Sequence, residues 1–303
     1  MVHVNLPAPA YSMKLSGTEW VSLEAWGRRK GSRLFARYKQ GHEVLHRLVL
    51  SGLRFDLMPG NRLAHCQGMQ LWLGFAPKLV KGHLYLHHLD IKKQIEPISM
   101  GFPALGRVVV IDPGHGKTNL GTQSIYNKTR EKTYTLDWAL RLKRLLEAKG
   151  WKVYLTRTTD KALSLTDRVK FADRVNAALF ISLHFNSASR AVSGLETYCI
   201  APVGMPSHFT RGSPDRINTA LPNNTYDTRN LQLACRVHSS MLATCGMPDR
   251  GVRRIRFMTV LKGQKRPAIL VEGGYLSNPT EAKKVADAAY RQKLAQGVAN
   301  ALP

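Results

Sequence analysis

The sequence predicts an α/β fold in which a mostly parallel, twisted sheet carries helices on both faces, preceded by a small β-rich (α+β) domain. Three observations predict the α/β part: a β-branched run that ends at Asp-Pro-Gly, a leucine-striped helix after it, and a second apolar run after that helix. Strands that alternate with helices pair in parallel, because each helix carries the chain back over the sheet. We place the β-rich accessory domain at residues 1–100 and the α/β domain at residues 101–303.

The elements of the α/β domain are expected in a regular order. Val108–Ile111 is a β-branched run typical of a buried strand, and Asp112-Pro113-Gly114 breaks it. Leucines at helical spacing predict a helix that Gly150 terminates. Gly273-Gly274 predicts a tight turn after the last strand. The remaining predicted segments are strands at 151–156, 178–183, 194–200 and 269–272 and helices at 131–149, 165–176, 230–245 and 280–301.

The first hundred residues contain short apolar runs separated by glycines, a pattern that indicates hairpins or a small sheet. Trp20, Leu23 and Trp26 stand at helical spacing and predict a short amphipathic piece. The tract Ile91–Met100, which contains Pro97, predicts a linker into the second domain.

Composition identifies a folded globular protein, because 44% of the 303 residues are hydrophobic and 21% are charged. No apolar run approaches the ~20 residues that cross a bilayer. The segment Met1–Tyr11 lacks the basic and then apolar pattern of a secretory signal peptide. Either the protein is cytoplasmic or its export signal is absent from this sequence.

The net charge of +25 comes from 45 Lys and Arg against 20 Asp and Glu, and both predicted domains share it. Such a surface attracts polyanions: nucleic acid, anionic lipid or an anionic wall polymer. No helix-turn-helix, zinc-finger or aromatic RNA-binding motif accompanies the charge, so we expect nonspecific steering or solubility and no specific nucleic-acid partner.

The four cysteines form no C-x-x-C pair, so a cysteine zinc site or redox motif is not expected. Cys235 and Cys245 are candidates for a disulfide in an exported protein, and buried free thiols are the alternative.

Polar side chains follow three predicted strands: His115 after the first, His184 after the strand at 178–183, and Glu272 at the end of the last. Ligands of open α/β sheets bind at the carboxyl ends of the strands. Glu131 opens the helix after the first loop, so all four groups are expected at one edge of the sheet. Two His and one Glu leave zinc with an open position, as in hydrolytic sites, and Glu272 is then placed to move the proton.

Each of these residues also has an ordinary structural interpretation. Glu131 alone is a helix N-terminal charge, and His184 alone is a hydrogen-bonded core histidine. A carboxylate such as Glu272, at the end of a buried strand, usually has a partner. The joint pattern is much more specific than any single member.

A second candidate motif is His42-Glu43-Val44-Leu45-His46, which matches the five letters of the metalloprotease pattern H-E-x-x-H. That pattern needs a helix that presents both histidines on one face, and Gly41 and Gly52 leave room for about three turns at most. We therefore prefer the strand-end site.

The α/β domain resembles a known family, the zinc-dependent N-acetylmuramoyl-L-alanine amidases of bacterial cell-wall turnover. The resemblance runs from about Arg107 to Ala301. It is carried by Ile-Asp-Pro-Gly-His-Gly at 111–116, Glu131 before the leucine-rich helix, Leu-Thr-Arg at 155–157 with Asp160, Ser-Leu-His-Phe-Asn-Ser at 182–187, Gly-Leu-Glu-Thr-Tyr at 194–198 and Val-Glu-Gly-Gly-Tyr-Leu-Ser-Asn at 271–278.

The resemblance implies that His115, Glu131 and His184 are zinc ligands and that Glu272 is the catalytic carboxylate. It implies hydrolysis of the amide between the lactyl group of N-acetylmuramic acid and L-alanine of the peptidoglycan stem peptide. The expected location is then periplasmic, extracellular or at the cell wall. Asn186 and Arg157 are candidates for orienting substrate, with fold-stabilising hydrogen bonds as the alternative.

The sequence departs from the family pattern in two places. Lys117 follows His-Gly where the family often has a second Gly, and the polar segment Pro202–Arg229 is longer than in the smallest members. Asp215 and Asp227 in that segment are candidates for a carboxylate that silences the metal. Two other functions remain open: a non-catalytic binder of anionic wall polymer, and a metallopeptidase that cleaves another peptide bond.

Overall fold

The computed structural model describes residues 8–303 other than Arg33 and Leu105. The first seven residues of the segment Met1–Tyr11, examined above for a signal peptide, therefore lie outside the described residues. Of the helices described, none is both long enough and apolar enough to cross a membrane.

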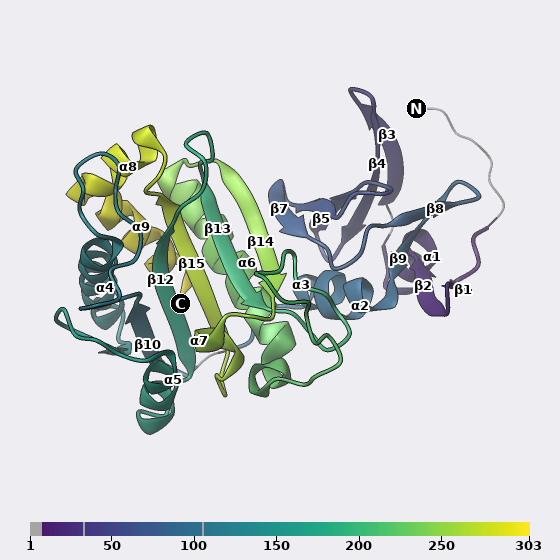
Figure 1. The fold of residues 1–303 in the computed structure, drawn as a ribbon. Coiled ribbons are helices and arrows are strands. Elements are labelled where there is room, and N and C mark those ends of the chain that lie inside the picture. The colour runs from purple at the N-terminus through teal and green to yellow at the C-terminus, as the bar shows by residue number, and fades with distance from the viewer. Residues whose placement is uncertain (1–7, 33, 105) are drawn as a thin grey trace.

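One long sheet runs through the molecule (Figure 1). Its strand order is β11-β10-β12-β15-β13-β14-β7-β6-β5-β4-β3. Its C-terminal strands are β10 (Val108–Pro113), β11 (Lys152–Leu155), β12 (Leu179–Asn186), β13 (Leu195–Ile200), β14 (Asp249–Ile255) and β15 (Ala268–Tyr275). The N-terminal strands are β3 (Leu34–Gln40), β4 (Glu43–Leu50), β5 (Leu53–Leu57), β6 (Leu63–Cys66) and β7 (Met69–Trp72).

The predicted mostly parallel sheet is wrong, because the sheet is mixed. β11, β10, β12 and β15 pair in parallel, but β13 pairs antiparallel to β15. β14, which the sequence analysis missed, is parallel to β13. The starts of β13 and β14 consequently lie at the same edge as the ends of β10, β12 and β15.

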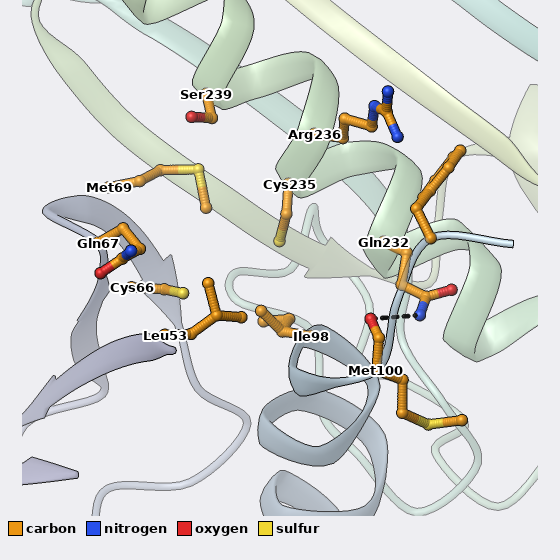
Figure 2. Close-up of a pocket in the computed structure, with 11 residues that line it drawn as sticks. Leu53, Cys66, Gln67, Met69, Ile98, Met100, Gln232, Cys235, Arg236 and Ser239 are labelled. Carbon is orange, nitrogen blue, oxygen red and sulfur yellow. Dashed lines mark hydrogen bonds between the residues drawn. The ribbon is translucent and has the colours of Figure 1, made fainter. Parts of the chain in front are cut away.

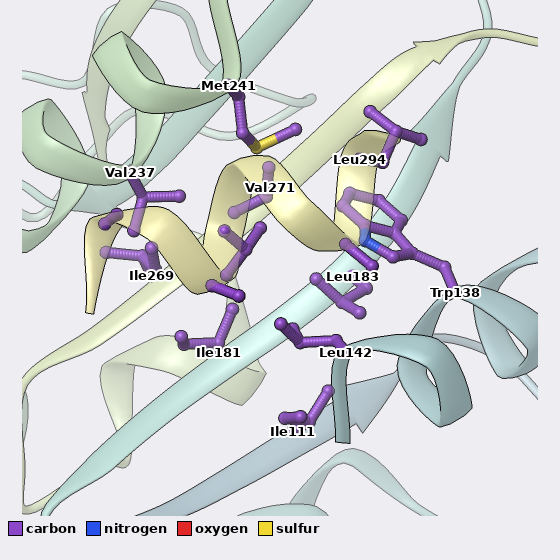
Figure 3. Close-up of a cluster of buried hydrophobic side chains, with 14 of the residues drawn as sticks. Ile111, Trp138, Leu142, Ile181, Leu183, Val237, Met241, Ile269, Val271 and Leu294 are labelled. Carbon is purple, nitrogen blue, oxygen red and sulfur yellow. The ribbon is translucent and has the colours of Figure 1, made fainter. Parts of the chain in front are cut away.

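Helices cover both faces of the C-terminal part, as predicted (Figure 1). Side chains from α4, α6 and α9 share one core with alternate residues of the strands, including Ile111, Leu183 and Val271 (Figure 3). The opposite face packs against α5 and α7. The helices are α4 (Glu131–Ala148), α5 (Leu165–Arg174), α6 (Asp227–Cys245), α7 (Thr259–Lys262), α8 (Pro279–Ala286) and α9 (Ala288–Ala301), with a 3-10 turn, η2 (Pro222–Tyr226).

Two predictions near the C-terminus are wrong in detail. Gly273 and Gly274 are not a tight turn, because both lie inside β15. The bond pattern between β12 and β15 is irregular there, and Gly274 has φ of +128°, which favours glycine. The predicted helix 280–301 is two helices, because Asp287 ends α8 and caps α9.

The N-terminal residues add a second, four-stranded sheet of order β1-β2-β9-β8. Trp20 lies in β2 rather than in a helix, and the helix α1 begins only at Leu23. The tract Ile91–Met100, predicted to be a linker, is mostly helical. The elements are β1 (Ser12–Leu15), β2 (Thr18–Ser22), α1 (Leu23–Arg29), β8 (Lys78–Val80), β9 (His83–His87), α2 (His88–Asp90), the π-helix η1 (Ile91–Ile95) and α3 (Glu96–Ser99).

The two parts of the chain join through the sheet itself. β7 pairs in parallel with β14 at Leu71 and Val252. The backbone N–H of Gln70 donates to the Asp249 carboxylate over 2.6 Å. Leu71 packs in the same core as the C-terminal strands, so the boundary expected near residue 100 is crossed by hydrogen bonds and by shared apolar contacts.

A small apolar pocket of about 240 Å³ lies where the two parts meet (Figure 2). Cys66 lines it from the N-terminal part, and Cys235 and Gln232 line it from α6. All four cysteines are free, so the disulfide between Cys235 and Cys245 is not formed. Burial raises the pKa of the Cys66 thiol to about 12, which makes it an unreactive apolar group.

Candidate metal centre and its catalytic face

The predicted site lies at the carboxyl edge of β10, β12 and β15. β10 ends at Pro113 and delivers His115 two residues later, whereas His184 lies inside β12. Glu131 is the first residue of α4. His115 follows a strand, Glu131 begins a helix and His184 lies near the end of its strand, and the fold brings the three together.

The ligand atoms of His115, Glu131 and His184 all lie within 4.8 Å of one another, the one such group of three among the described residues. Oε1 of Glu131 is 2.9 Å from Nε2 of His115 and 3.0 Å from Nδ1 of His184. The Glu131 side chain is 3% exposed and each imidazole is 19% exposed, so the cluster faces solvent on its histidine side. The three residues could hold a metal ion that keeps one side open to solvent.

The loop that carries His115 is held in an unusual conformation. His115 has φ of +65°, a region that costs a non-glycine residue free energy. Its Nδ1 lies 2.8 Å from Oδ1 of Asn119. Because an amide oxygen only accepts, Nδ1 donates to Asn119, and Nε2 is the ring nitrogen that faces Glu131.

Two glycines make room for the cluster. A Cβ on Gly114 would lie 2.3–2.7 Å from the ring atoms of His184. A Cβ on Gly121 would lie 2.6 Å from Oε2 of Glu131 and 2.7 Å from Cδ2 of His115. Any side chain at either position would clash with a residue of the His-Glu-His cluster.

Electrostatics keep Glu131 ionised. Burial alone would raise its pKa, but hydrogen bonds from His115 and His184 and their charges lower it to about 2. The backbone N–H groups of Thr122 and Phe185 also donate to its two oxygens. A buried carboxylate with four donors is a fixed negative charge.

Glu272 lies beside this cluster in β15. It stands opposite His184 on one side and opposite Glu196 of β13 on the other. Its Oε2 is buried and has no hydrogen-bond partner among the described residues. Burial raises its pKa well above the ordinary value, and the negative charges of Glu131 and Glu196 raise it further. Such a group readily takes up a proton.

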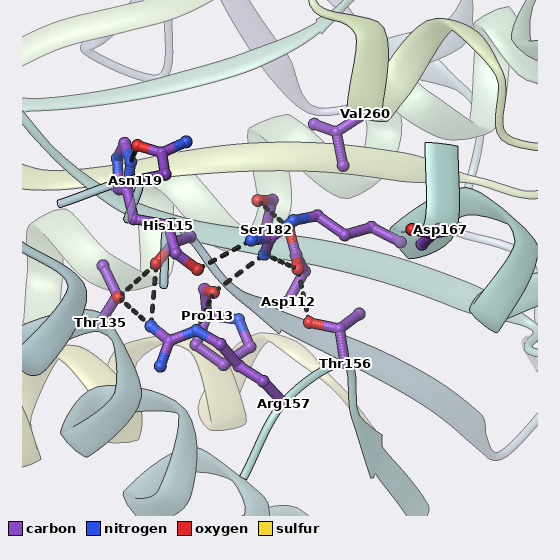
Figure 4. Close-up of polar contacts among 12 residues, drawn as sticks. Asp112, Pro113, His115, Asn119, Thr135, Thr156, Arg157, Asp167, Ser182 and Val260 are labelled. Carbon is purple, nitrogen blue, oxygen red and sulfur yellow. Dashed lines mark hydrogen bonds and ion pairs between the residues drawn. The ribbon is translucent and has the colours of Figure 1, made fainter. Parts of the chain in front are cut away.

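Two buried arginines frame the loop after β10, and sequence reasoning did not single out Arg168. Arg168 pairs with Asp112 over 2.6 Å and donates to the carbonyl oxygen of His115 over 2.7 Å. Arg157 donates to the carbonyl oxygens of Pro113 and Gly114 (Figure 4). Arg157 is 3% exposed, which favours the fold-stabilising alternative for this residue. The sequence feature that could have pointed to Arg168 is Asp112, a charged residue directly after the predicted buried strand 108–111.

Asn186 belongs to a second polar network around Glu196. Its Nδ2 donates to Oε2 of Glu196 over 2.8 Å, and the Tyr198 hydroxyl donates to the same oxygen. Arg250 and Arg253 lie 2.8 and 3.1 Å from Oε1 of Glu196. Burial would raise the pKa of Glu196, but the charge of Arg253 and these hydrogen bonds lower it below its ordinary value.

The segment 202–229 does not bring its acidic residues to the metal cluster. Asp215 accepts a hydrogen bond from the backbone N–H of Ser207. Asp227 is buried in α6 and pairs with Lys93 over 3.2 Å. Neither candidate for a silencing carboxylate is among the three clustered residues.

The H-E-x-x-H pentad has no metal-binding geometry. Glu43 through His46 lie in strand β4, where residues four apart are too far from each other to share one ion. His46 is buried, and burial lowers its pKa to about 4.

Comparison with known proteins gives consistent matches. The sporulation-specific N-acetylmuramoyl-L-alanine amidase of Bacillus subtilis is 33% identical over 196 residues, which cover 64% of this chain and 66% of that protein. N-acetylmuramoyl-L-alanine amidase LytC of the same organism is 33% identical over 198 residues, 65% of this chain and 35% of that protein. The chain thus spans between about a third and two thirds of these relatives.

Solved structures match the same region. The catalytic domain of CwlV, an amidase from Bacillus (Paenibacillus) polymyxa var. colistinus, has a TM-score of 0.54 and 32% identity, and the match covers 65% of this chain and 96% of that domain. AmiC2 of Nostoc punctiforme has a TM-score of 0.54 and 30% identity over 66% of this chain and 97% of its own. The family model described as N-acetylmuramoyl-L-alanine amidase, Amidase_3, matches residues 109–303. With the His-Glu-His cluster and the neighbouring glutamate in place, the chain belongs to the Amidase_3 family of N-acetylmuramoyl-L-alanine amidases.

Proposed function

We propose that this protein hydrolyses the amide between N-acetylmuramic acid and L-alanine in peptidoglycan, with zinc as its cofactor. The observation that carries the proposal is the convergence of His115, Glu131 and His184 beside a buried Glu272 whose Oε2 has no hydrogen-bond partner among the described residues. The named activity of the relatives supports the same reaction. The expected location is the cell wall or the periplasm, because the substrate lies there.

The residues present fit zinc. Two imidazoles and one ionised carboxylate are the donor set of open zinc sites, and their ligand atoms already lie within 4.8 Å of one another. His115 and His184 would bind through Nε2 and Nδ1, the atoms that face Glu131. A zinc ion held there supplies a Lewis acid for the scissile carbonyl and lowers the pKa of water.

Glu272 then performs the proton transfers. Its carboxylate accepts the proton of the attacking water and delivers it to the leaving nitrogen of L-alanine, as a general base and then a general acid. Burial beside two other carboxylates strengthens its hold on that proton. Asn186 lies at the end of the neighbouring strand and can orient substrate, whereas Arg157 fixes the loop that carries His115.

The two other functions gain less support. The relatives compared above are all named amidases, which argues against a non-catalytic binder of anionic wall polymer. A metallopeptidase acting on another bond would use the same ligands and release a different product. We assign residues 1–100 an accessory role, since the family match begins only at residue 109.

The test is digestion of purified peptidoglycan followed by mass spectrometry of the released products. We expect free stem peptides that begin with L-alanine, loss of release after chelation, and recovery with added zinc. His184→Ala should abolish release. His42→Ala, in the exposed turn before β4, is the matched control and should leave release unchanged. Full activity in excess chelator, or cleavage only at other bonds, would contradict the proposal.

A further inference from the structure

Arg250 occupies a position at the active-site edge that no role yet explains. It is the second residue of β14, and β14 begins at the edge where β12 and β15 end. The pairing of β13 and β14 shifts between Leu195 and Thr197, and Gly251 has φ of +89°. This irregularity brings the Arg250 guanidinium to Glu196, directly across the sheet from Glu272.

The guanidinium is held in place on several sides. Its Nε donates to Oε1 of Glu196 over 2.8 Å, and its Cζ lies 5.4 Å from the ring centre of Tyr275. Gly194 leaves space for the stem, because a Cβ there would lie 2.9 Å from Cγ of Arg250. The side chain nevertheless keeps 31% of its surface exposed. It is a preorganised cation at a solvent-facing position.

The N-terminal part fixes the backbone of the same residue. Nε1 of Trp72 in β7 donates to the Arg250 carbonyl oxygen over 3.1 Å. The Trp72 ring also lies 5.4 Å from Cζ of Arg253. Arg250 is therefore positioned by both parts of the chain.

The local charge favours an anion. Glu196 is shared by two guanidinium groups, those of Arg250 and Arg253, so this one carboxylate neutralises only one of the two positive charges. His208, on the ring of Trp72, responds to this field: burial is the main cause that lowers its pKa to about 4, and Arg253, Arg62 and Arg250 lower it further.

We propose that Arg250 is a substrate-binding residue that takes a carboxylate of the stem peptide. The inference rests on the proposed function. In N-acetylmuramic acid the lactyl carboxyl is consumed by the scissile amide, so a carboxylate near the cut comes from the peptide side. A guanidinium with one edge held by Glu196 offers its remaining N–H groups in the planar fork that matches a carboxylate.

The test compares two soluble muropeptides that differ only at the second stem residue, which carries either a free α-carboxylate or its carboxamide. We expect zinc-loaded wild-type protein to prefer the carboxylate form by about 10-fold or more in kcat/KM, mainly through KM. Arg250→Gln should remove that preference by slowing only the carboxylate form, and Arg250→Lys should retain part of it. Arg216→Gln, which removes an exposed charge from the segment 202–229, is the control and should keep the preference.

The outcomes distinguish a substrate-binding role of Arg250 from a purely structural one. Equal cleavage of both muropeptides by wild-type protein, or an equal loss on both in Arg250→Gln, would overturn the substrate-binding role and leave only a structural one. If Arg250→Gln fails to fold, the wild-type preference and the Arg250→Lys variant still decide the question. Cleavage of neither muropeptide by wild-type protein would instead contradict the proposed function itself.

Discussion

The two carboxylates of the candidate site, Glu131 and Glu272, are both buried and chemically identical, yet their surroundings differ completely. Glu131 receives hydrogen bonds from two imidazoles and two backbone N–H groups, and its pKa falls to about 2. Glu272 has an oxygen without a partner and two negative neighbours, and its pKa is raised well above normal. The difference shows how one edge of a sheet shifts the pKa of the same residue type in opposite directions.

The largest effect should come from substitution of Glu131. Glu131→Gln keeps the shape but removes the charge, so we expect loss of bound zinc and of measurable amidase activity. Metal analysis of the purified variant and product release from peptidoglycan measure both. Glu147→Gln, in the same helix but exposed, is the matched control and should keep metal and activity. Full zinc content in Glu131→Gln would remove Glu131 from the ligand set.

Substitution of Glu272, the proposed proton carrier, should lower activity without removing the metal. Glu272→Gln should retain zinc but lose about 10²–10⁴ in kcat, the usual contribution of a positioned general acid or base. Zinc content and kcat measured on the same sample separate the two functions. Unchanged kcat would show that another group moves the proton.

A third effect concerns Arg168, which holds the loop that carries His115. Arg168→Met would leave Asp112 charged and buried, so we expect the free energy of unfolding to fall by about 3–5 kcal/mol. Urea denaturation monitored by circular dichroism measures it. Lys143→Met, which removes an exposed pair with Glu147 on α4, should cost at most about 0.5 kcal/mol. Similar decreases in the free energy of unfolding in both variants would mean that the buried Arg168–Asp112 pair stabilises the fold no more than an exposed pair does.

A further expected effect is a pH dependence of stability in metal-free protein. Because the folded pKa of Glu272 is raised, its contribution to stability is full below its unfolded value of about 4.5 and is lost as pH rises above it. The stability of wild type relative to Glu272→Gln should therefore fall with pH, by at most about 1.4 kcal/mol per pH unit. Glu131 has the opposite sign, since its contribution is lost as pH falls from 4.5 toward 2. Urea unfolding in chelator between pH 4 and 8 checks the first trend; a constant difference would contradict it.

The sequence predicted that the candidate residues meet at one edge of the sheet, and the reason is local. His115 follows β10, and His184 and Glu272 lie near the ends of β12 and β15, so the apolar runs before them already indicate their place. The sequence did not reveal Arg168, because a charged residue on a predicted helix is ordinarily solvated. Only the tertiary contact with Asp112 shows that it is buried.

The fold was predicted less completely. Strand β14 was missed because its residues include three arginines. Two of these, Arg253 and Arg254, are buried through contacts distant in sequence, such as that of Arg253 with Glu196. The direction of β13 could not be read from composition, so the mixed sheet was missed as well. The domain boundary is similarly obscured, since the pairing of β7 with β14 depends on residues far apart in the chain.

Gly114 and Gly121 give a further criterion for recognising inactive homologues, in addition to His115, Glu131, His184 and Glu272. A homologue that preserves every ligand but bears even alanine at either position would push a methyl group into an imidazole or a carboxylate. Its sequence would still contain all four residues, yet the added methyl group would distort the geometry of the candidate metal site. A search for inactive members of the family should therefore check that both positions are glycine, in addition to the two histidines and the two glutamates.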